Sequence, residues 1–230
     1  GDHRDLHVRS RRQRQMCIRD RIISSLITSV FAEIKIGIIL GFTGPIKSLT
    51  PAMANSAEIA FKEASESGSL LDGKAIKVIR ADSTCKDTSA ASVAAKKIIS
   101  QGVKAILGGV CSEVTETILL ESAVPNKIVM ISPAATSASL TSLEDKGFFF
   151  RTTPSENRGG QILADITKDK RIKKVAITYA NNDYSKDLAK AYKAAVESHG
   201  LEVTIIASHE DDKKDYSSEA VSYTHLTLPT

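Results

Sequence analysis

Runs of apolar, β-branched residues alternate along this chain with longer segments in which apolar residues recur at helical spacing. The run Ile34–Leu40 (IKIGIIL) has the length of a strand, and a Gly/Pro turn follows it at 41–45. The next segment, 50–67, carries apolar residues three and four positions apart, which is the period of a helix with one buried face. The chain therefore begins its ordered part with a predicted strand, turn and helix.

The same two patterns repeat down to residue 207. Further strands are expected at 75–81, 103–108, 128–131, 148–152, 174–179 and 202–207. Further helices are expected at 88–101, 112–122, 156–168 and 184–198. Strands that alternate with helices of this length form parallel sheets covered by helices on both faces. The predicted fold class is therefore α/β, with parallel sheets flanked by helices.

Loops at the carboxyl ends of the strands are the places to look for a binding site. In open parallel sheets, ligands bind beyond these ends, where loops lead into helices. Four such loops are predicted in the first part of the chain: 41–49, 82–87, 108–112 and 132–139.

Composition excludes several classes of protein. The 230 residues are 42% hydrophobic and 25% charged, which is typical of a globular chain. No stretch reaches the ~18 consecutive apolar residues of a complete transmembrane helix. Tryptophan is absent and aromatic residues make up 5%, which argues against a stacking surface for single-stranded nucleic acid.

The net charge of +4 comes from the arm 1–21, which holds seven arginines against three aspartates. Some basic arms bind nucleic acid or membrane surfaces. This one has no apolar period and resembles translated sequencing-adapter sequence, as do residues 221–230. We expect both segments to be non-native, and Cys17 in the arm to have no role.

Between the arm and the first strand lies the apolar run 22–32 (IISSLITSVFA). It matches the apolar region and cleavage site of a secretory signal peptide, with Val30 and Ala32 at the −3 and −1 positions of a cut before Glu33. The alternative is a buried first strand or helix. Export would place the chain in an oxidising compartment.

Common catalytic and nucleotide-binding motifs are absent. The chain has no G-x-G-x-x-G, P-loop, G-x-S-x-G or H-E-x-x-H pattern. Outside the terminal segments the only histidines are His199 and His209, and the acidic run 210–212 is expected to be a solvated loop rather than a metal site. We expect no enzymatic activity, no cofactor and no metal.

Hydroxyl groups in two of the four loops offer candidate binding chemistry. Ser112 (in GGVCSEVTET) stands where a helix N-cap is expected, and Thr136 (in SPAATSAS) precedes a short predicted helix. Both residues have an ordinary interpretation as capping residues. The other interpretation is that the two turns bind one small carboxylate, while carbonyls near Ala134 accept hydrogen bonds from an ammonium group.

Cys85 and Cys111 lie in two of these loops and are the only cysteines outside the arm. An even pair in an exported chain indicates a disulfide. Two buried free thiols are the alternative.

Five stretches together point to a known family. They are IKIGIILGFTGP, the segment from ADSTCKDTSA to ILGGVCS, ISPAATS, FFFRTTPS and YANNDYSKDLA. From Ile34 to about Ser218 the chain resembles the periplasmic Leu/Ile/Val-binding proteins of ABC amino-acid importers, which have a two-lobed type I periplasmic binding fold. The resemblance implies a first lobe at 33–152 and a partial second lobe at 153–220.

The resemblance also implies a disulfide between Cys85 and Cys111 and a set of ligand-binding residues. The residues that match the family's site are Ser112, Ala134, Ala135, Thr136, Tyr184 and Leu49. In the family, the serine and threonine bind the ligand carboxylate, the first alanine accepts from the ammonium, and the tyrosine covers the ligand. Leu49 replaces a tyrosine that is common in amino-acid binders.

The implied function is that of a monomeric, periplasmic solute-binding protein from a Gram-negative-type bacterium. It would capture an amino acid, most simply a branched-chain aliphatic one, and deliver it to an ABC transporter permease by hinge closure, without nucleic acid or a cofactor. A ligand-sensing receptor ectodomain of the same fold is the alternative. The resemblance also implies that the acidic residue of the second lobe that pairs with the ligand ammonium lies beyond Ser218. Because the second lobe is partial, we expect poor solubility and little binding by the chain alone.

Overall fold

The computed structural model describes residues 33–69, 74–211 and 213–221. The basic arm, the apolar run 22–32 and residues 222–230 lie outside the described residues, so the expectations for them are not tested. Contacts divide the chain into two units, Gly1–Glu33 and Ile34–Thr230. No helix in the described part combines the length and apolar character needed to cross a bilayer.

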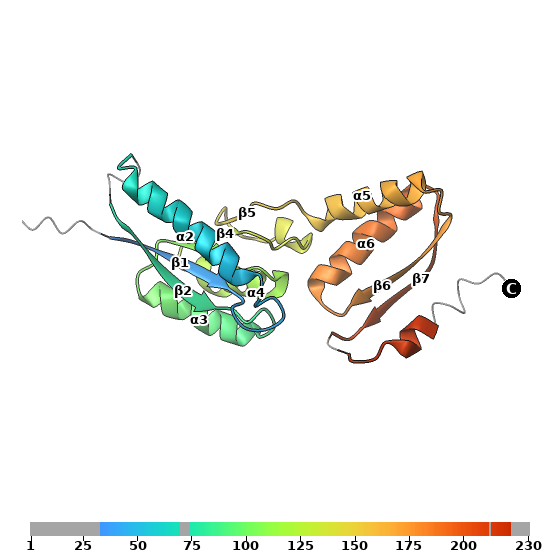
Figure 1. Cartoon of the computed structure of the whole chain (residues 1–230), viewed down its shortest axis with the longest axis horizontal. Coiled ribbons are helices and arrows are strands. Elements are labelled where there is room, and N and C mark those ends of the chain that lie inside the picture. Colours follow the sequence, from blue (N-terminus) through green and yellow to red (C-terminus); the bar gives the residue numbers. More distant parts are fainter. Residues whose placement is uncertain (1–32, 70–73, 212, 222–230) are drawn as a thin grey trace, which may run out of the picture. The chain divides into compact units, whose positions relative to one another are not determined.

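Strands and helices alternate along the described residues (Figure 1). The strands are β1 (Ile34–Leu40), β2 (Ile76–Asp82), β3 (Ala105–Gly108), β4 (Val129–Ser132), β5 (Phe149–Arg151), β6 (Lys174–Ala180) and β7 (Glu202–His209). The helices are α2 (Thr50–Glu66), α3 (Thr88–Ser100), α4 (Ser112–Ile118), α5 (Glu156–Asp169) and α6 (Asp183–Ser198).

Most boundaries agree with the sequence pattern to within two residues. The largest difference is the helix expected at 112–122, which is α-helical only to Ile118 and continues as the π-helical segment η2 (Leu119–Ala123). The periodicity of apolar residues does not distinguish these two windings. A short 3₁₀ turn, η3 (Ser139–Thr141), lies before β5.

The strands form two parallel sheets, which confirms the predicted fold class. Five strands pair in the order β2-β1-β3-β4-β5, and β6 pairs with β7 in a separate sheet. The chain moves outward from β1 to β2 and then returns to β3 on the other side of β1. The loops after β1 and β3 therefore diverge at a switch point, where such sheets bind ligands.

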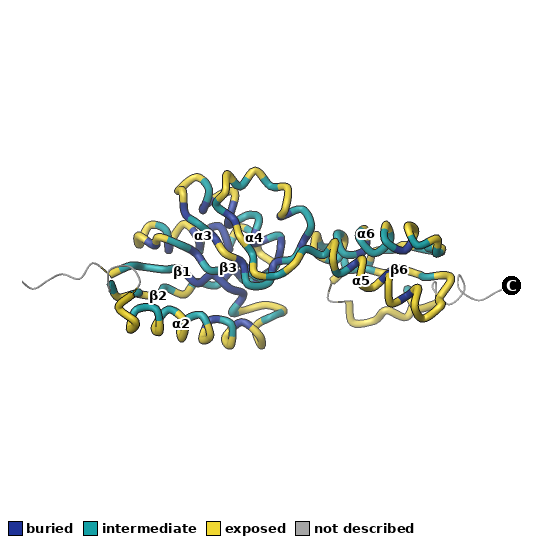
Figure 2. Tube along the Cα trace, turned by 90° about the horizontal axis from the view of Figure 1, so that it is seen from above, coloured by how far each residue is buried: buried dark blue, intermediate teal, exposed yellow. Residues whose placement is uncertain are grey.

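Helices cover both faces of the five-stranded sheet, with α2 on one face and α3 and α4 on the other (Figure 2). Alternate residues of β1 supply the two cores. Ile39 packs with the α3 and α4 side, whereas Ile38 and Leu40 pack with Ala54 of α2. All four are fully buried. Burial on both faces explains why this strand is a continuous apolar run instead of an alternating one.

The helices α5 and α6 pack closely against each other, and α6 also contacts both strands of the two-stranded sheet. A Cβ atom on Gly160 of α5 would come within 2.6 Å of backbone atoms of Ala191 and Tyr192. Only glycine allows the two helices to approach this closely. The hydroxyls of Thr167 and Tyr192 form a hydrogen bond of 2.7 Å across the same pair.

Candidate functional site

A cleft of about 610 Å³ opens at the carboxyl ends of the first four strands. All four loops selected from the sequence contribute residues: Pro45 and Ile46, Cys85 and Lys86, Val110 to Ser112, and Ala134 and Thr136. Glu113, at the start of α4, lines it as well. The rule that parallel strands present their loops at one edge therefore identified this side of the cleft correctly.

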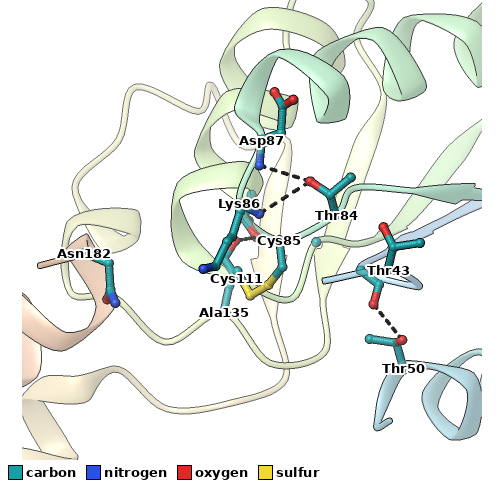
Figure 3. The surroundings of a disulfide bond; sticks show 12 residues. Thr43, Thr50, Thr84, Cys85, Lys86, Asp87, Cys111, Ala135 and Asn182 are labelled. Atoms are coloured by element: carbon teal, nitrogen blue, oxygen red, sulfur yellow. Dashed lines mark hydrogen bonds between the residues drawn. A yellow bond between two sulfur atoms is a disulfide. The ribbon is translucent and has the colours of Figure 1, made fainter. Parts of the chain in front are cut away.

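A disulfide joins the loops that precede α3 and α4. Cys85 and Cys111 are bonded, with Cα atoms 5.4 Å apart and a sequence separation of 26. Figure 3 shows Thr84 beside the bridge, where its hydroxyl accepts hydrogen bonds from the N–H groups of Lys86, at 3.5 Å, and Asp87, at 3.0 Å. The bridge thus ties an ordered turn to the residue that immediately precedes Ser112.

Ser112 is not the N-cap of α4, so its interpretation as a capping residue is wrong. The N-cap is Cys111, which makes no side-chain cap bond, and Ser112 is the first helical residue. The Ser112 side chain is almost fully buried, and its hydroxyl oxygen accepts a hydrogen bond of 3.3 Å from the backbone N–H of Ser137. Because the oxygen serves as the acceptor, the hydroxyl hydrogen can donate to a ligand.

Thr136 does not cap the turn that follows it either. The N-cap of η3 is Ala138, whereas the Thr136 carbonyl accepts a hydrogen bond of 2.9 Å from the N–H of Glu156. Thr136 and Ala134 both line the cleft. Ser132 shapes their turn, since its hydroxyl accepts from the N–H of Ala134 at 3.3 Å.

Ala135 and Leu49 do not line the cleft in the structure. Ala135 is fully buried in the main core, and its N–H donates to Ser132 Oγ at 2.9 Å. Leu49 precedes α2 with 57% of its surface exposed, while Ile46 of the same loop lines the cleft. The structure therefore brings Ser112, Ala134 and Thr136 together but not these two residues.

Tyr184, near the start of α6, lines the cleft and is 44% exposed. Burial of the phenol, with a smaller contribution from the negative charge of Glu156, raises the pKa of Tyr184. The phenol is therefore neutral at physiological pH and can both donate and accept a hydrogen bond.

Several lining residues escaped the sequence reasoning because it examined loops of the first sheet alone. Asn181 and Asn182 follow β6, and Glu210 and Asp211 follow β7. The side-chain amides of the two asparagines donate to Glu210 and Asp211, at 3.2 and 3.1 Å. Both acidic residues lie in an exposed loop, as expected from the sequence, but they also line the cleft. The same carboxyl-end rule applied to β6 and β7 would have found them. Within the described residues no group of side chains has the arrangement of a metal site.

Negative charge predominates around the cleft. Its lining contains four carboxylates, on Glu113, Glu156, Glu210 and Asp211, and one ammonium, on Lys86. Glu113 accepts a hydrogen bond of 3.0 Å from the N–H of Asp183. This balance favours a ligand that carries a cationic group in addition to any carboxylate.

Asp82, at the end of β2, forms hydrogen bonds with the loop that follows β1 and with the loop that follows β2. Its carboxylate accepts from the Thr43 hydroxyl at 2.6 Å and from the Thr84 N–H at 2.8 Å. Burial by itself would raise the pKa of Asp82, but the hydrogen bonds from Thr43, Thr84 and the Phe42 backbone together lower it. The fold thus stabilises the ionised form of this carboxyl.

The variant Asp82→Asn is expected to be less stable than the wild type at neutral pH. A lowered pKa in the folded state means that the stabilisation is present above the ordinary value of 3.8 and is lost as the pH falls through the folded-state pKa. The difference in melting temperature should therefore shrink in acid, as measured by thermal unfolding between neutral and acidic pH. Asp169→Asn, on the exposed end of α5, is the control. If the difference in melting temperature between Asp82→Asn and the wild type did not change with pH, it would contradict the assignment.

Comparisons with known proteins agree with this architecture. A family model described as periplasmic binding protein matches residues 33–223. The Leu/Ile/Val-binding protein homolog 3 of Brucella melitensis is 30% identical over 198 residues, which are 83% of this chain and 51% of that protein. The chain spans about half the length of the curated relatives it matches.

Solved structures share the fold at lower identity. A leucine-binding protein from Thermotoga maritima matches with a TM-score of 0.70 and 24% identity, covering 84% of this chain and 53% of that one. A solute-binding protein of an ABC transporter from R. palustris, in complex with 4-hydroxybenzoate, matches with a TM-score of 0.72 and 20% identity, covering 85% and 52%. Similar folds in these proteins therefore bind different carboxylates.

Proposed function

This chain belongs to the periplasmic binding protein family, and on that basis we propose that it captures a free amino acid for delivery to an ABC transporter permease. The family consists of binding proteins and not of enzymes. In this proposal the protein is a periplasmic monomer whose first lobe is 33–152, while 153–220 belongs to a second lobe. Closure of the two lobes over the ligand is the signal that the permease recognises.

The observation that carries the proposal is the pairing of hydroxyl donors with carboxylates across one cleft. Ser112 presents a hydroxyl hydrogen, and Thr136 lines the cleft beside it. These groups suit a ligand carboxylate, to which hydrogen bonds are charge-assisted. The Ala134 carbonyl, together with acidic side chains such as Glu156, suits an ammonium group. A zwitterion satisfies both sides, whereas a simple carboxylate supplies no positive charge for the acidic side chains around the cleft.

The remaining lining supports an aliphatic side chain. Ile46, Val110 and the Cys85–Cys111 disulfide contribute apolar surface, and the Tyr184 ring adds an aromatic wall. Branched-chain amino acids are therefore the proposed ligand class. The curated relatives named as Leu/Ile/Val-binding proteins support the same choice.

A thermal-shift screen of the intact protein that carries this sequence tests the proposal. The panel contains the standard amino acids and 4-hydroxybenzoate, and a ligand that binds only the folded state raises the melting temperature. We expect leucine, isoleucine and valine to give the largest shifts. The proposal would be overturned if only 4-hydroxybenzoate raised the melting temperature, or if none of the amino acids raised it.

Uptake of labelled leucine by cells lacking the gene separates the two roles of this fold. A transport protein is required for high-affinity uptake. A receptor ectodomain would bind the same amino acid while its loss left uptake unchanged.

A further inference from the structure

Ser137 forms hydrogen bonds with residues of α4, α6 and β5. It is fully buried, and its N–H donates to the Ser112 hydroxyl oxygen at 3.3 Å. Its own hydroxyl donates a hydrogen bond to the carboxylate of Asp187. Its carbonyl accepts from Nη1 of Arg151 at 2.8 Å. Every polar group of this one residue is thus engaged, and one of its bonds goes to a proposed ligand-binding hydroxyl.

Asp187 lies on α6, three residues after Tyr184 and therefore near it on the helix surface. Its carboxylate accepts a second hydrogen bond, of 3.2 Å, from the N–H of Ser139. The half-buried Asp187 thus binds two points of the 137–139 segment. It does not line the cleft, so any effect on a ligand must pass through another residue.

The direction of the Ser137–Ser112 hydrogen bond determines what Ser112 can do. A serine hydroxyl has one hydrogen and two lone pairs. The Ser137 N–H takes a lone pair, which directs the hydrogen of Ser112 toward other acceptors. A ligand carboxylate is such an acceptor, and the bond to it is strong only if the Ser137 peptide stays in place.

We propose that Asp187 is a positioning residue for ligand binding: it fixes the Ser137 peptide so that the Ser112 hydroxyl donates to the ligand carboxylate. The inference rests on the proposed function, because it assumes a carboxylate ligand at Ser112. Beyond that function, the inference says that Asp187 on α6 affects the Ser112 hydroxyl through Ser137. By linkage, ligand binding at Ser112 and the hydrogen bonds of Asp187 then strengthen each other.

Calorimetric titration of the intact protein with L-leucine tests this role. Asp187→Ala should weaken binding about tenfold, the amount expected from losing a hydrogen-bonded charged support. Asp187→Asn should restore most of the affinity, because its amide oxygen still accepts from Ser137 or Ser139. In a Ser112→Ala background, Asp187→Ala should have little further effect, since residues that act through each other are not additive.

Asp165→Ala is the matched control, since it removes an α5 carboxylate that pairs with His199 at 2.7 Å and does not line the cleft. If Asp187→Ala does not fold, Ser137→Ala removes one of the two hydrogen bonds that Asp187 accepts while keeping the peptide, and a smaller loss of affinity is expected. Wild-type affinity in these variants, or an equal loss with and without Ser112, would overturn the positioning role alone. Failure of the wild type to bind any amino acid would overturn the proposed function together with it.

Discussion

The double variant Ser112→Ala/Thr136→Ala is expected to lose measurable binding of L-leucine in calorimetric titration. Each single variant should weaken binding by ~1–3 kcal/mol, because a charge-assisted hydrogen bond to the ligand carboxylate is lost. The two hydroxyls line one cleft, and Ser112 is positioned as a donor by the Ser137 N–H. The double variant should therefore lose more binding free energy than either single variant.

A neighbouring hydroxyl supplies the control for this experiment. Thr117 lies on the same short helix as Ser112, but its hydroxyl donates to the Glu113 carbonyl at 3.1 Å and does not line the cleft. Thr117→Ala should bind leucine as the wild type does. Unchanged leucine affinity in both single variants at the cleft would remove the site assignment, whereas a loss in Thr117→Ala as well would indicate general damage to the fold.

Removal of the disulfide is expected to have the second large effect. The variant Cys85→Ser/Cys111→Ser should lower the free energy of unfolding by roughly 3–4 kcal/mol in the chain-entropy description of a loop of this length. The bridge spans 26 residues, so the unfolded chain regains much conformational freedom. Denaturant titration of the wild type and the variant measures the difference.

The same variant should also weaken leucine binding, because Cys111 immediately precedes Ser112 and Cys85 lines the cleft. Wild-type protein held in a reductant is the control and should resemble the variant. Equal denaturation midpoints in oxidised and reduced protein would show that the bridge does not support the fold.

The acidic partner for the ligand ammonium is a residue that the sequence pattern alone does not locate. The resemblance implies that this acid lies beyond Ser218 and that Tyr184 is the residue that covers the ligand. The structure places Glu156, Glu210 and Asp211 around the cleft. These residues are separated in sequence from Ser112, and only the parallel pairing of β6 with β7 brings two of their loops to one edge.

The sequence by itself determined the α/β alternation, nearly all element boundaries and the four loops that line one side of the cleft. These features follow from local periodicity and from the geometry of parallel strands, which a linear pattern records. Tertiary structure decided what individual residues in those loops do. The sequence leaves Ser112 open to two interpretations, a cap or a ligand donor, and the contact with Ser137, 25 residues away, exists only in the folded chain. Ala135 and Leu49 share loops with lining residues yet lie elsewhere, because the turns direct one side chain into the core and leave the other exposed to solvent.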